Sequence, residues 1–171
     1  TLLPLGKLDP GLREPETPLH IGDFAAGAAQ AEELGVDAML VEETKDDPFQ
    51  LLALGASTTS SIQLGTSVAM AFPRSPTATA LSAWSLSKLS DGRFILGLGS
   101  SHKVQVEPEH GVTYDKPLTR VRESVAAIRA LLAEGTATYQ GELVRMQSFD
   151  LWFEPLRNTL PIYLSAVFPK M

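Results

Sequence analysis

The feature that most constrains the fold is the alternation of short apolar segments with helical ones. Apolar runs that begin near residues 36, 62 and 93 have the composition of buried strands, and they recur at intervals of about 30 residues, the length of a βαβ unit. Between them, Asp47 precedes Pro48 and Ser75 precedes Pro76, and both pairs are typical of a helix N-terminus. The pattern predicts an α/β fold with a parallel sheet and covering helices.

The expected helices and strands follow from this alternation of segments. We expect strands within 2–8, 36–41, 62–72, 93–99 and 160–168, and helices at 20–34, after Pro48, after Pro76 and at 117–134. Residues 135–160 are expected to form a hairpin or irregular insertion before the fifth strand. Residues 1–171 are treated as one partial (β/α) barrel domain.

Two architectures fit this order of elements: an open, doubly wound sheet, or part of a (β/α)₈ TIM-type barrel. A complete barrel needs about 250 residues, so a chain of 171 residues would hold the first five strands of one. A partial barrel has two unpaired sheet edges and an uncovered inner face. We therefore expect either a piece of a longer protein or a homo-oligomer that covers this face.

Composition and charge exclude several classes of function. The net charge of −6 disfavours binding to nucleic acid, and the apolar runs are far shorter than the ~18 residues of a membrane span. The absence of cysteine excludes disulfides and thiolate metal sites. The three histidines lack the spacing of a metal-binding helix, so no metal is expected. Without a signal-peptide pattern at the start, a cytoplasmic location is expected.

The stretch GRFILGLGSSHK, which starts at Gly92, has three interpretations. Gly97 and Gly99 match the first two glycines of a dinucleotide-binding fingerprint, but His102 stands in the third place and no helix is expected directly after it. The glycines are also suited to close packing against a neighbouring strand. Alternatively, the segment from Gly99 to Ser101 forms a ligand cradle at the carboxyl end of a strand.

Acidic residues also follow a predicted strand. Glu42 and Glu43 come directly after the apolar run 36–41, and alternation along a strand would direct one of them into the barrel and the other outward. Asp46 and Asp47 read as helix-capping charges. The interpretations of Glu43 as a site residue and as a capping residue both stay open at this point.

Several longer segments together resemble a known family. The segments LGTSVAMAFPRSP, SDGRFILGLGSS and PIYLSAVFPKM, in this order and spacing, resemble the luciferase-like monooxygenase superfamily, in particular its coenzyme F420-dependent oxidoreductases. The resemblance covers about residues 20–171. It implies a (β/α)₈ barrel that binds F420 or FMN at the carboxyl ends of its strands. It also implies an enzyme that transfers hydride between F420 and a small-molecule substrate.

The resemblance also implies site residues. The third strand is expected to carry a bulge with a non-prolyl cis peptide at Ser67-Val68. The cofactor-binding residues implied are Glu43, Thr44, Ser67, Val68, Gly99, Ser100, Ser101, Ala166, Val167 and Phe168. His102 stands where related enzymes often have a glutamate that acts as general acid, so His102 and Glu43 are the catalytic candidates. Thr44 replaces a histidine that some F420 enzymes use in proton transfer.

Two alternatives to an F420-dependent oxidoreductase remain from the sequence. One is an FMN-dependent monooxygenase of the same superfamily. The other is a non-catalytic half-barrel that self-associates; the resemblance implies a dimer, which is common among full-length members of the family. Neither the substrate nor the activity of the isolated chain follows from the sequence.

Overall fold

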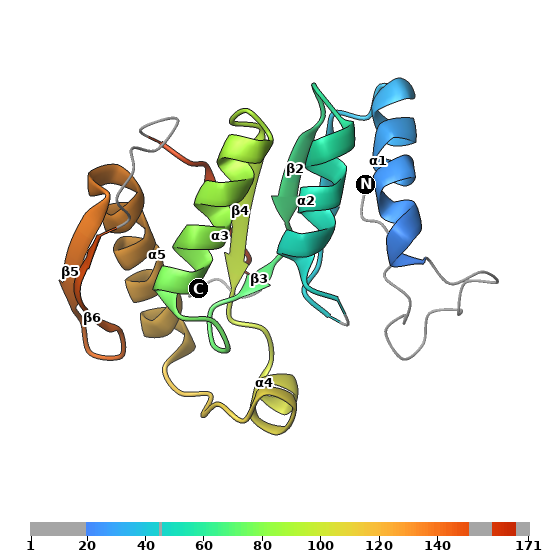
Figure 1. The fold of residues 1–171 in the computed structure, drawn as a ribbon. Coiled ribbons are helices and arrows are strands. Elements are labelled where there is room, and N and C mark those ends of the chain that lie inside the picture. Colours follow the sequence, from blue (N-terminus) through green and yellow to red (C-terminus); the bar gives the residue numbers. More distant parts are fainter. Residues whose placement is uncertain (1–19, 45, 151–158, 167–171) are drawn as a thin grey trace.

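A parallel sheet with helices on one face forms the centre of the protein (Figure 1). The computed structural model describes residues 20–44, 46–150 and 159–166. The strands of the sheet are β1 (Ala38–Val41), β2 (Gln63–Thr66), β3 (Ala69–Met70), β4 (Phe94–Gly99) and β7 (Ile162–Leu164). β2 pairs with β1 and β4, β3 also pairs with β4, and β7 pairs with β4; every pairing is parallel.

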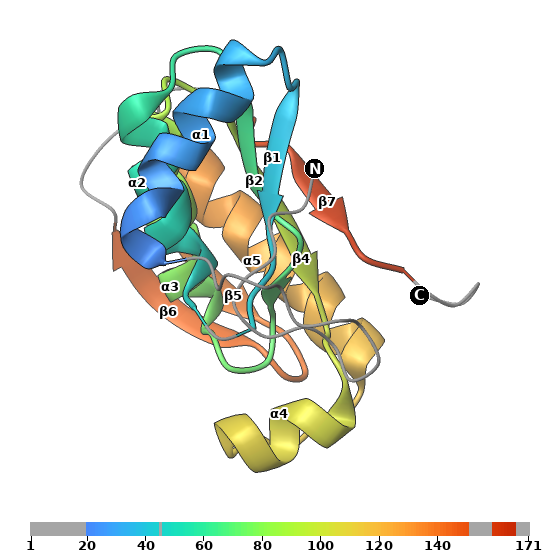
Figure 2. The ribbon, with the colours of Figure 1, turned by 90° about the vertical axis from the view of Figure 1, so that its right-hand side faces the viewer.

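The helices connect these strands. They are α1 (Phe24–Glu33), which a 3₁₀ turn at Ile21–Asp23 precedes, α2 (Pro48–Thr58), α3 (Pro76–Leu89), α4 (Lys103–His110) and α5 (Pro117–Glu134). Figure 2 shows α1, α2, α3 and α5 on the same side of the strands. This arrangement is expected, because parallel neighbours need a crossover that runs back over the sheet. No helix in the described ranges is long and apolar enough to cross a membrane.

The helix boundaries confirm the capping signals of the sequence. The Asp47 carboxylate accepts a hydrogen bond from the amide of Phe49 (2.9 Å), and the Ser75 hydroxyl accepts one from the amide of Ala78 (3.1 Å). α1 ends before Gly35, whose φ of 76° lies in the left-handed region that a helix C-terminus favours. Local sequence signals therefore set where these helices begin and end.

The core lies between the sheet and its helices. Leu64 of β2 faces α2, since its side chain contacts the space beside Gly55, and Leu64 and Leu52 are fully buried. Phe94 of β4 is likewise fully buried. Each such side chain contributes about 1.5–3 kcal/mol of burial free energy.

The opposite face of the sheet is built differently. Gly65 faces away from α2, and a Cβ there would meet the side chains of Leu40 and Ile95, so these three residues share this second face. Tyr163 of β7 pairs in register with Gly97 of β4 and is 62% exposed. The expected self-association through this face stays a prediction.

Helix α4 corrects one expectation. The sequence analysis expected no helix directly after the glycine-ended strand, where the segment VEPEHGVTYDKP intervenes. The structure has a helix from Lys103, in which the carbonyl of His102 accepts hydrogen bonds from the amides of Gln105 and Val106. Pro108 lies near its end and Gly111 closes it with a φ of 65°. Proline has no backbone N–H, so Pro108 removes one hydrogen bond from the last turn of this short helix. The turns that precede it are unaffected.

Two further details concern α5 and the strand that follows α2. Leu118, at the start of α5, is 50% exposed, whereas Val121, Ile128, Leu131 and Leu132 form the buried face of this helix. The break in the strand that follows α2 lies at Ser67-Val68, as expected, and Gly65 lies within β2. The predicted strand at 2–8 lies outside the described residues.

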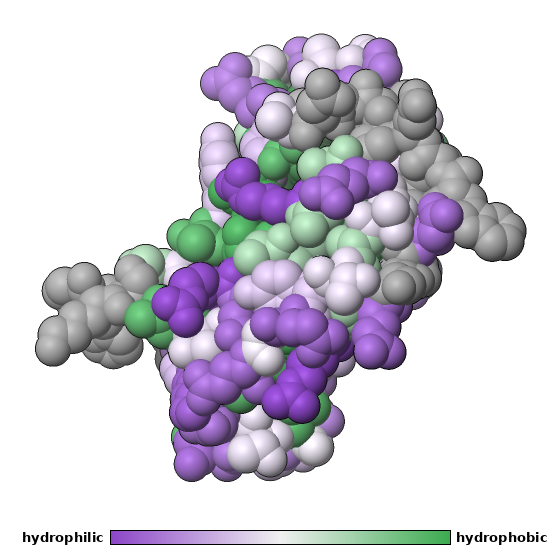
Figure 3. Space-filling view, turned by 90° about the vertical axis from the view of Figure 1, so that its left-hand side faces the viewer, coloured by the Kyte–Doolittle hydropathy of each residue, from purple (hydrophilic) through white to green (hydrophobic). Residues whose placement is uncertain are grey.

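The predicted hairpin is present before the fifth strand of the sheet. β5 (Thr136–Gln140) and β6 (Arg145–Asp150) pair antiparallel and lie beside α5, at the side of the molecule away from α1 (Figure 1). The hydroxyl of Thr77 on α3 contacts the sulfur of Met146 at 3.1 Å. Hydrophilic and apolar residues are mixed on this side of the molecule (Figure 3).

A buried carboxylate anchors the turn of this hairpin. Glu123 on α5 is 5% exposed and accepts hydrogen bonds from the amides of Glu142, Leu143 and Val144, each at 2.9 Å. Burial alone would raise the pKa of Glu123, but the three amide donors outweigh it and hold this pKa below 4.5.

We predict that Glu123→Ala lowers the free energy of unfolding by about 2–3 kcal/mol, because three turn amides lose a charged acceptor. Chemical denaturation followed by circular dichroism measures the change. Glu134→Ala, at an exposed position of the same helix, is the matched control and should change stability by less than about 0.5 kcal/mol. Equal effects of the two substitutions would contradict the anchoring role.

A second carboxylate ties α1 to the residues that precede β2. Glu32 accepts hydrogen bonds from the amide and hydroxyl of Ser61 and from the amides of Ser60 and Ile62. These bonds, led by the Ser61 hydroxyl, lower the pKa of Glu32 from 4.5 to about 2.

This pKa predicts a dependence of stability on pH. A carboxylate with a lowered pKa in the folded state stabilises the fold above its unfolded pKa of 4.5, and this contribution is lost as the pH falls toward about 2. Glu32→Gln should therefore be less stable than wild type at pH 7, and the difference should shrink between pH 4.5 and 2. Thermal unfolding at a series of pH values tests this, with Glu33→Gln as the exposed control. A difference that is independent of pH would contradict it.

Candidate cofactor site

The strand segment that contains β2 and β3 is interrupted where it lies beside β4. β2 ends at Thr66 and β3 begins at Ala69, and the peptide bond between Ser67 and Val68 is cis, as the resemblance implied. Gly65 pairs with Ile95 and Ala69 pairs with Leu98, so four residue steps on this strand face three on β4. The additional residue is a bulge of the predicted kind.

The two glycines of β4 make room for this bulge. A Cβ on Gly97 would lie 1.9 Å from the carbonyl oxygen of Thr66, and a Cβ on Gly99 would lie 2.7 Å from a methyl of Val68 and even nearer to the hydroxyl of Ser165. The Thr66 hydroxyl donates to the carbonyl of Gly97 (2.6 Å) and accepts from its amide (2.9 Å). Both glycines are thus enclosed within a strand, which does not match a dinucleotide-binding loop and supports the close-packing interpretation.

A cavity of about 410 Å³ opens at the carboxyl ends of the strands. Its lining comes from the segment after β1, from the bulge and β3, from the end of β4, from α4, from the segment before α5 and from the end of β7. The lining residues are Glu42, Glu43, Thr44, Val68, Met70, Ser100, Ser101, His102, Gln105, Tyr114 and Ser165. The volume is within the range of small-molecule sites.

The predicted site residues divide into three groups by position. Those that line the cavity are Glu43, Thr44, Val68, Ser100, Ser101 and His102. Ser67, Gly99 and Ala166 do not line it; the amide of Ser67 instead donates to the carbonyl of Val41 (2.7 Å). Val167 and Phe168 lie outside the described residues. The strand ends that the sequence singled out therefore meet at one end of the sheet.

Glu42 departs from the expected alternation. The sequence analysis directed one of Glu42 and Glu43 into the barrel and the other outward, but both line the cavity. β1 ends at Val41, so both glutamates come after the strand. The rule that side chains alternate along a strand therefore does not apply to them.

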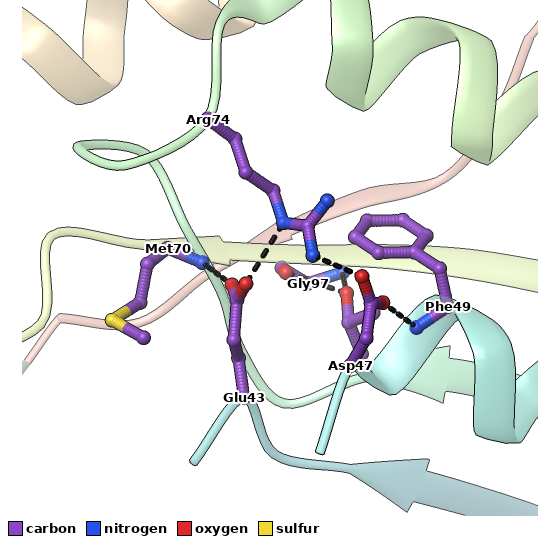
Figure 4. Close-up of polar contacts among 7 residues, drawn as sticks. Glu43, Asp47, Phe49, Met70, Arg74 and Gly97 are labelled. Atoms are coloured by element: carbon purple, nitrogen blue, oxygen red, sulfur yellow. Dashed lines mark hydrogen bonds and ion pairs between the residues drawn. The ribbon is translucent and has the colours of Figure 1, made fainter. Parts of the chain in front are cut away.

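An ion-pair network fixes Glu43 (Figure 4). One Glu43 oxygen accepts from Arg74 Nε (2.8 Å) and the other accepts from the amide of Met70 (2.6 Å). Arg74 Nη2 also donates to Asp47 (2.6 Å). Burial would lower the pKa of Arg74, but its hydrogen bonds to Asp47 and Glu43 outweigh this and raise it. Arg74 is therefore a permanent cation beside the cavity.

Sequence reasoning missed Tyr114. Its ring stacks on Phe72 with centroids 4.4 Å apart, and its hydroxyl donates to the carbonyl of Ser101 (3.0 Å). Ser101 has a φ of 56°, and its hydroxyl contacts the Gln105 amide oxygen (3.0 Å). Tyr114 thereby joins the segment before α5 to the cavity wall. No local pattern marks it, because the contact spans elements that are not adjacent in sequence.

The lining suits a flat, partly polar ring. Met70 is 2% exposed and forms apolar wall together with Val68 and Tyr114, while Ser100 and Ser101 add hydroxyls and backbone amides. A heteroaromatic ring matches such a mixture. No lysine or arginine lines the cavity among the described residues. The described residues also contain no cluster of three or more His, Asp or Glu that could hold a metal ion.

This geometry defines a partial α/β barrel with a small-molecule-sized cavity at the carboxyl ends of its strands. The sequence matches the luciferase-like monooxygenase family over residues 5–171, and the chain belongs to that family. A protein of Mycobacterium tuberculosis that is provisionally named a coenzyme F420-dependent oxidoreductase is 37% identical over 155 residues, which cover 83% of this chain and 45% of that protein.

Solved structures agree on the fold. The coenzyme F420-dependent tetrahydromethanopterin reductase of Methanopyrus kandleri superposes with a TM-score of 0.79 at 24% identity, covering 90% of this chain and 49% of that one. A type II Baeyer–Villiger monooxygenase of Pseudomonas putida in complex with FMN gives a TM-score of 0.73 at 20% identity, covering 84% and 45%. The chain thus spans about half the length of the proteins it matches, and its fold is part of a (β/α)₈ barrel.

We predict that Gly97→Ala destabilises the fold by about 3 kcal/mol or more, since its methyl group would collide with the backbone of Thr66. Gly27→Ala is the matched control: it lies within α1 with no atom within 4 Å of the added Cβ, and should stabilise by about 0.5–1 kcal/mol. Urea denaturation measures both. A Gly97→Ala protein as stable as wild type would contradict the packing described here.

Proposed function

We propose that this chain forms part of the cofactor site of an F420-dependent oxidoreductase that transfers hydride between the deazaflavin and a small organic substrate. The single observation that carries the proposal is the cavity at the carboxyl ends of β1, β3, β4 and β7 in a member of this family. The M. tuberculosis relative supports F420 as the cofactor. The identity of the substrate is left open.

When bound, the deazaflavin would supply the carbon centre that donates or accepts the hydride. The residues of this chain would bind and orient it. Val68 and Met70 would pack against one face of the ring, and the Ser100 and Ser101 hydroxyls and amides would bind polar atoms at its edge. Gly99 and Ser67 would act indirectly, by shaping the strand on which these groups lie.

His102 is the proposed proton-transfer residue. It lines the cavity but is exposed, at the N-cap of α4, so its imidazole can exchange protons with solvent and with a ligand in the cavity. Thr44, also exposed on the lining, would contribute a hydroxyl to the ring edge. Ala166 and the residues that follow it are proposed to contact the phosphate-bearing tail of the cofactor.

FMN is the second candidate cofactor. The solved neighbour from Pseudomonas putida is in complex with FMN and has the same fold, and the lining of the cavity does not by itself select between the two ring systems. The cavity therefore supports a cofactor site, and the choice of F420 over FMN depends on the relative.

We predict saturable binding of F420 by the purified chain, with FMN binding at least about tenfold weaker, a difference of 1.4 kcal/mol. Equilibrium titration followed by the absorbance and fluorescence of each cofactor measures the two affinities. Gln105→Trp should weaken F420 binding about tenfold or more by narrowing the cavity from α4. Ser85→Trp, at an exposed position of α3 outside the cavity, is the matched control and should leave binding unchanged.

The alternatives predict different results. Tighter binding of FMN would replace F420 by FMN in the proposal. Binding of neither cofactor, together with a dimer whose population depends on concentration, would favour the non-catalytic half-barrel. Sedimentation at several concentrations decides whether the chain self-associates.

A further inference from the structure

The adjacent residues Glu42 and Glu43 both line the cavity, but their surroundings differ. Both carboxylate oxygens of Glu43 are engaged, one by Arg74 Nε and one by the amide of Met70, and its side chain is 10% exposed. Glu42 is partly exposed and has no hydrogen bond or ion pair with any residue in the described ranges. Two acidic residues of identical chemistry thus have different freedom to meet a ligand.

Besides Glu43, Arg74 contacts Asp47 and the ring of Phe49, and these contacts fix the position of its guanidinium group. Its second nitrogen donates to Asp47 (2.6 Å), and its guanidinium lies 4.9 Å above the ring of Phe49. Asp47 in turn accepts from the amide of Phe49 at the start of α2. Figure 4 shows Arg74 between the two carboxylates with the Phe49 ring beside it. The network therefore joins the segment after β1, the start of α2 and the segment after β3.

The contact with Met70 connects this network to the cavity. Met70 belongs to β3, directly after the bulge, and its side chain and that of Val68 form the apolar wall. If Glu43 took up a proton from a ligand, it would lose the charge that attracts Arg74, and the Met70 amide would be left with a neutral, weaker acceptor. Its geometry therefore suits a structural support for the wall better than an acid or base.

Resting on the proposed function, we propose that the two glutamates have separate roles: Glu43 is a positioning residue that fixes the β3 wall through Arg74 and the Met70 amide, and Glu42 is the carboxylate that contacts the bound ring. A carboxylate accepts hydrogen bonds, and the pyrimidine edge of a flavin or deazaflavin carries an N–H donor. The free Glu42 oxygens match this donor. This assignment differs from the sequence, which assigned both catalysis and cofactor contact to Glu43.

Carboxylate labelling tests the assignment. The wild-type chain is treated with a water-soluble carbodiimide and an amine, and the modification of each glutamate is followed by tandem mass spectrometry. We expect Glu42 to react about tenfold or more faster than Glu43, because reaction at Glu43 requires loss of charged hydrogen bonds. Arg74→Met should raise the rate at Glu43 toward that at Glu42. Arg129→Met, on the exposed face of α5, is the matched control and should change neither rate.

Ligand protection and stability complete the test. Saturating F420, or FMN if that is the cofactor that binds, should slow the labelling of Glu42, and Glu42→Gln should weaken binding without changing the thermal midpoint. Glu43→Gln should lower the thermal midpoint of the ligand-free chain. Should Arg74→Met fail to fold, the ratio of the two rates in wild type still decides the role of Glu43.

Each result supports or overturns the proposal. Equal labelling of the two glutamates in wild type would refute the positioning role of Glu43. Unchanged labelling of Glu42 under saturating cofactor would refute its contact with the ring. If the wild-type chain binds neither cofactor, the proposed function fails and the role of Glu42 fails with it, whereas slow labelling of Glu43 would still support its role in holding β3.

Discussion

The close approach of the β2–β3 bulge to β4 is the constraint on which the site depends. β4 pairs with β2, β3 and β7, so any displacement of this strand would move all of them. The bulge can lie against β4 only because Gly97 and Gly99 lack side chains. Once β4 is fixed, Ser100 and Ser101 leave its end at the cavity, opposite Val68. The glycines therefore act on the site through packing, and the serines beside them supply the polar groups.

The polar network around Arg74 adds a second level of organisation. The sheet fixes the strand ends, but the loops that follow them have no ladder of backbone hydrogen bonds. Arg74 replaces that ladder with ion pairs to Glu43 and Asp47, which lie on the loop after β1. Their side chains are 10% and 31% exposed, so these pairs are better protected from solvent than ordinary surface salt bridges. One cation thus orders the polar edge of the cavity, and it leaves Glu42 outside the network.

The sequence predicted the elements better than the contacts between them. Local signals such as Asp47-Pro48 and Ser75-Pro76 placed helix starts correctly, because capping depends on neighbours in the chain. The α4 helix was not predicted, because its apolar pattern is weak and Pro108 is a residue that disfavours helix interiors. In the site, the resemblance gave the position of the bulge. The roles of Arg74 and Tyr114 could not be predicted, because each depends on partners about 13–42 positions away along the chain.

The hydrogen bonds of Glu32 and Arg93 lie at the amino ends of the strands, whereas the cavity lies at their carboxyl ends. Glu32 binds the residues before β2, and Arg93, just before β4, donates to the carbonyls of Thr59 and Ile62 (2.8 and 2.7 Å). In a parallel barrel the amino ends of the strands serve stability and the carboxyl ends serve chemistry. Laboratory evolution of a hardier protein can therefore concentrate on the amino end, where gains in robustness do not have to be traded against ligand recognition.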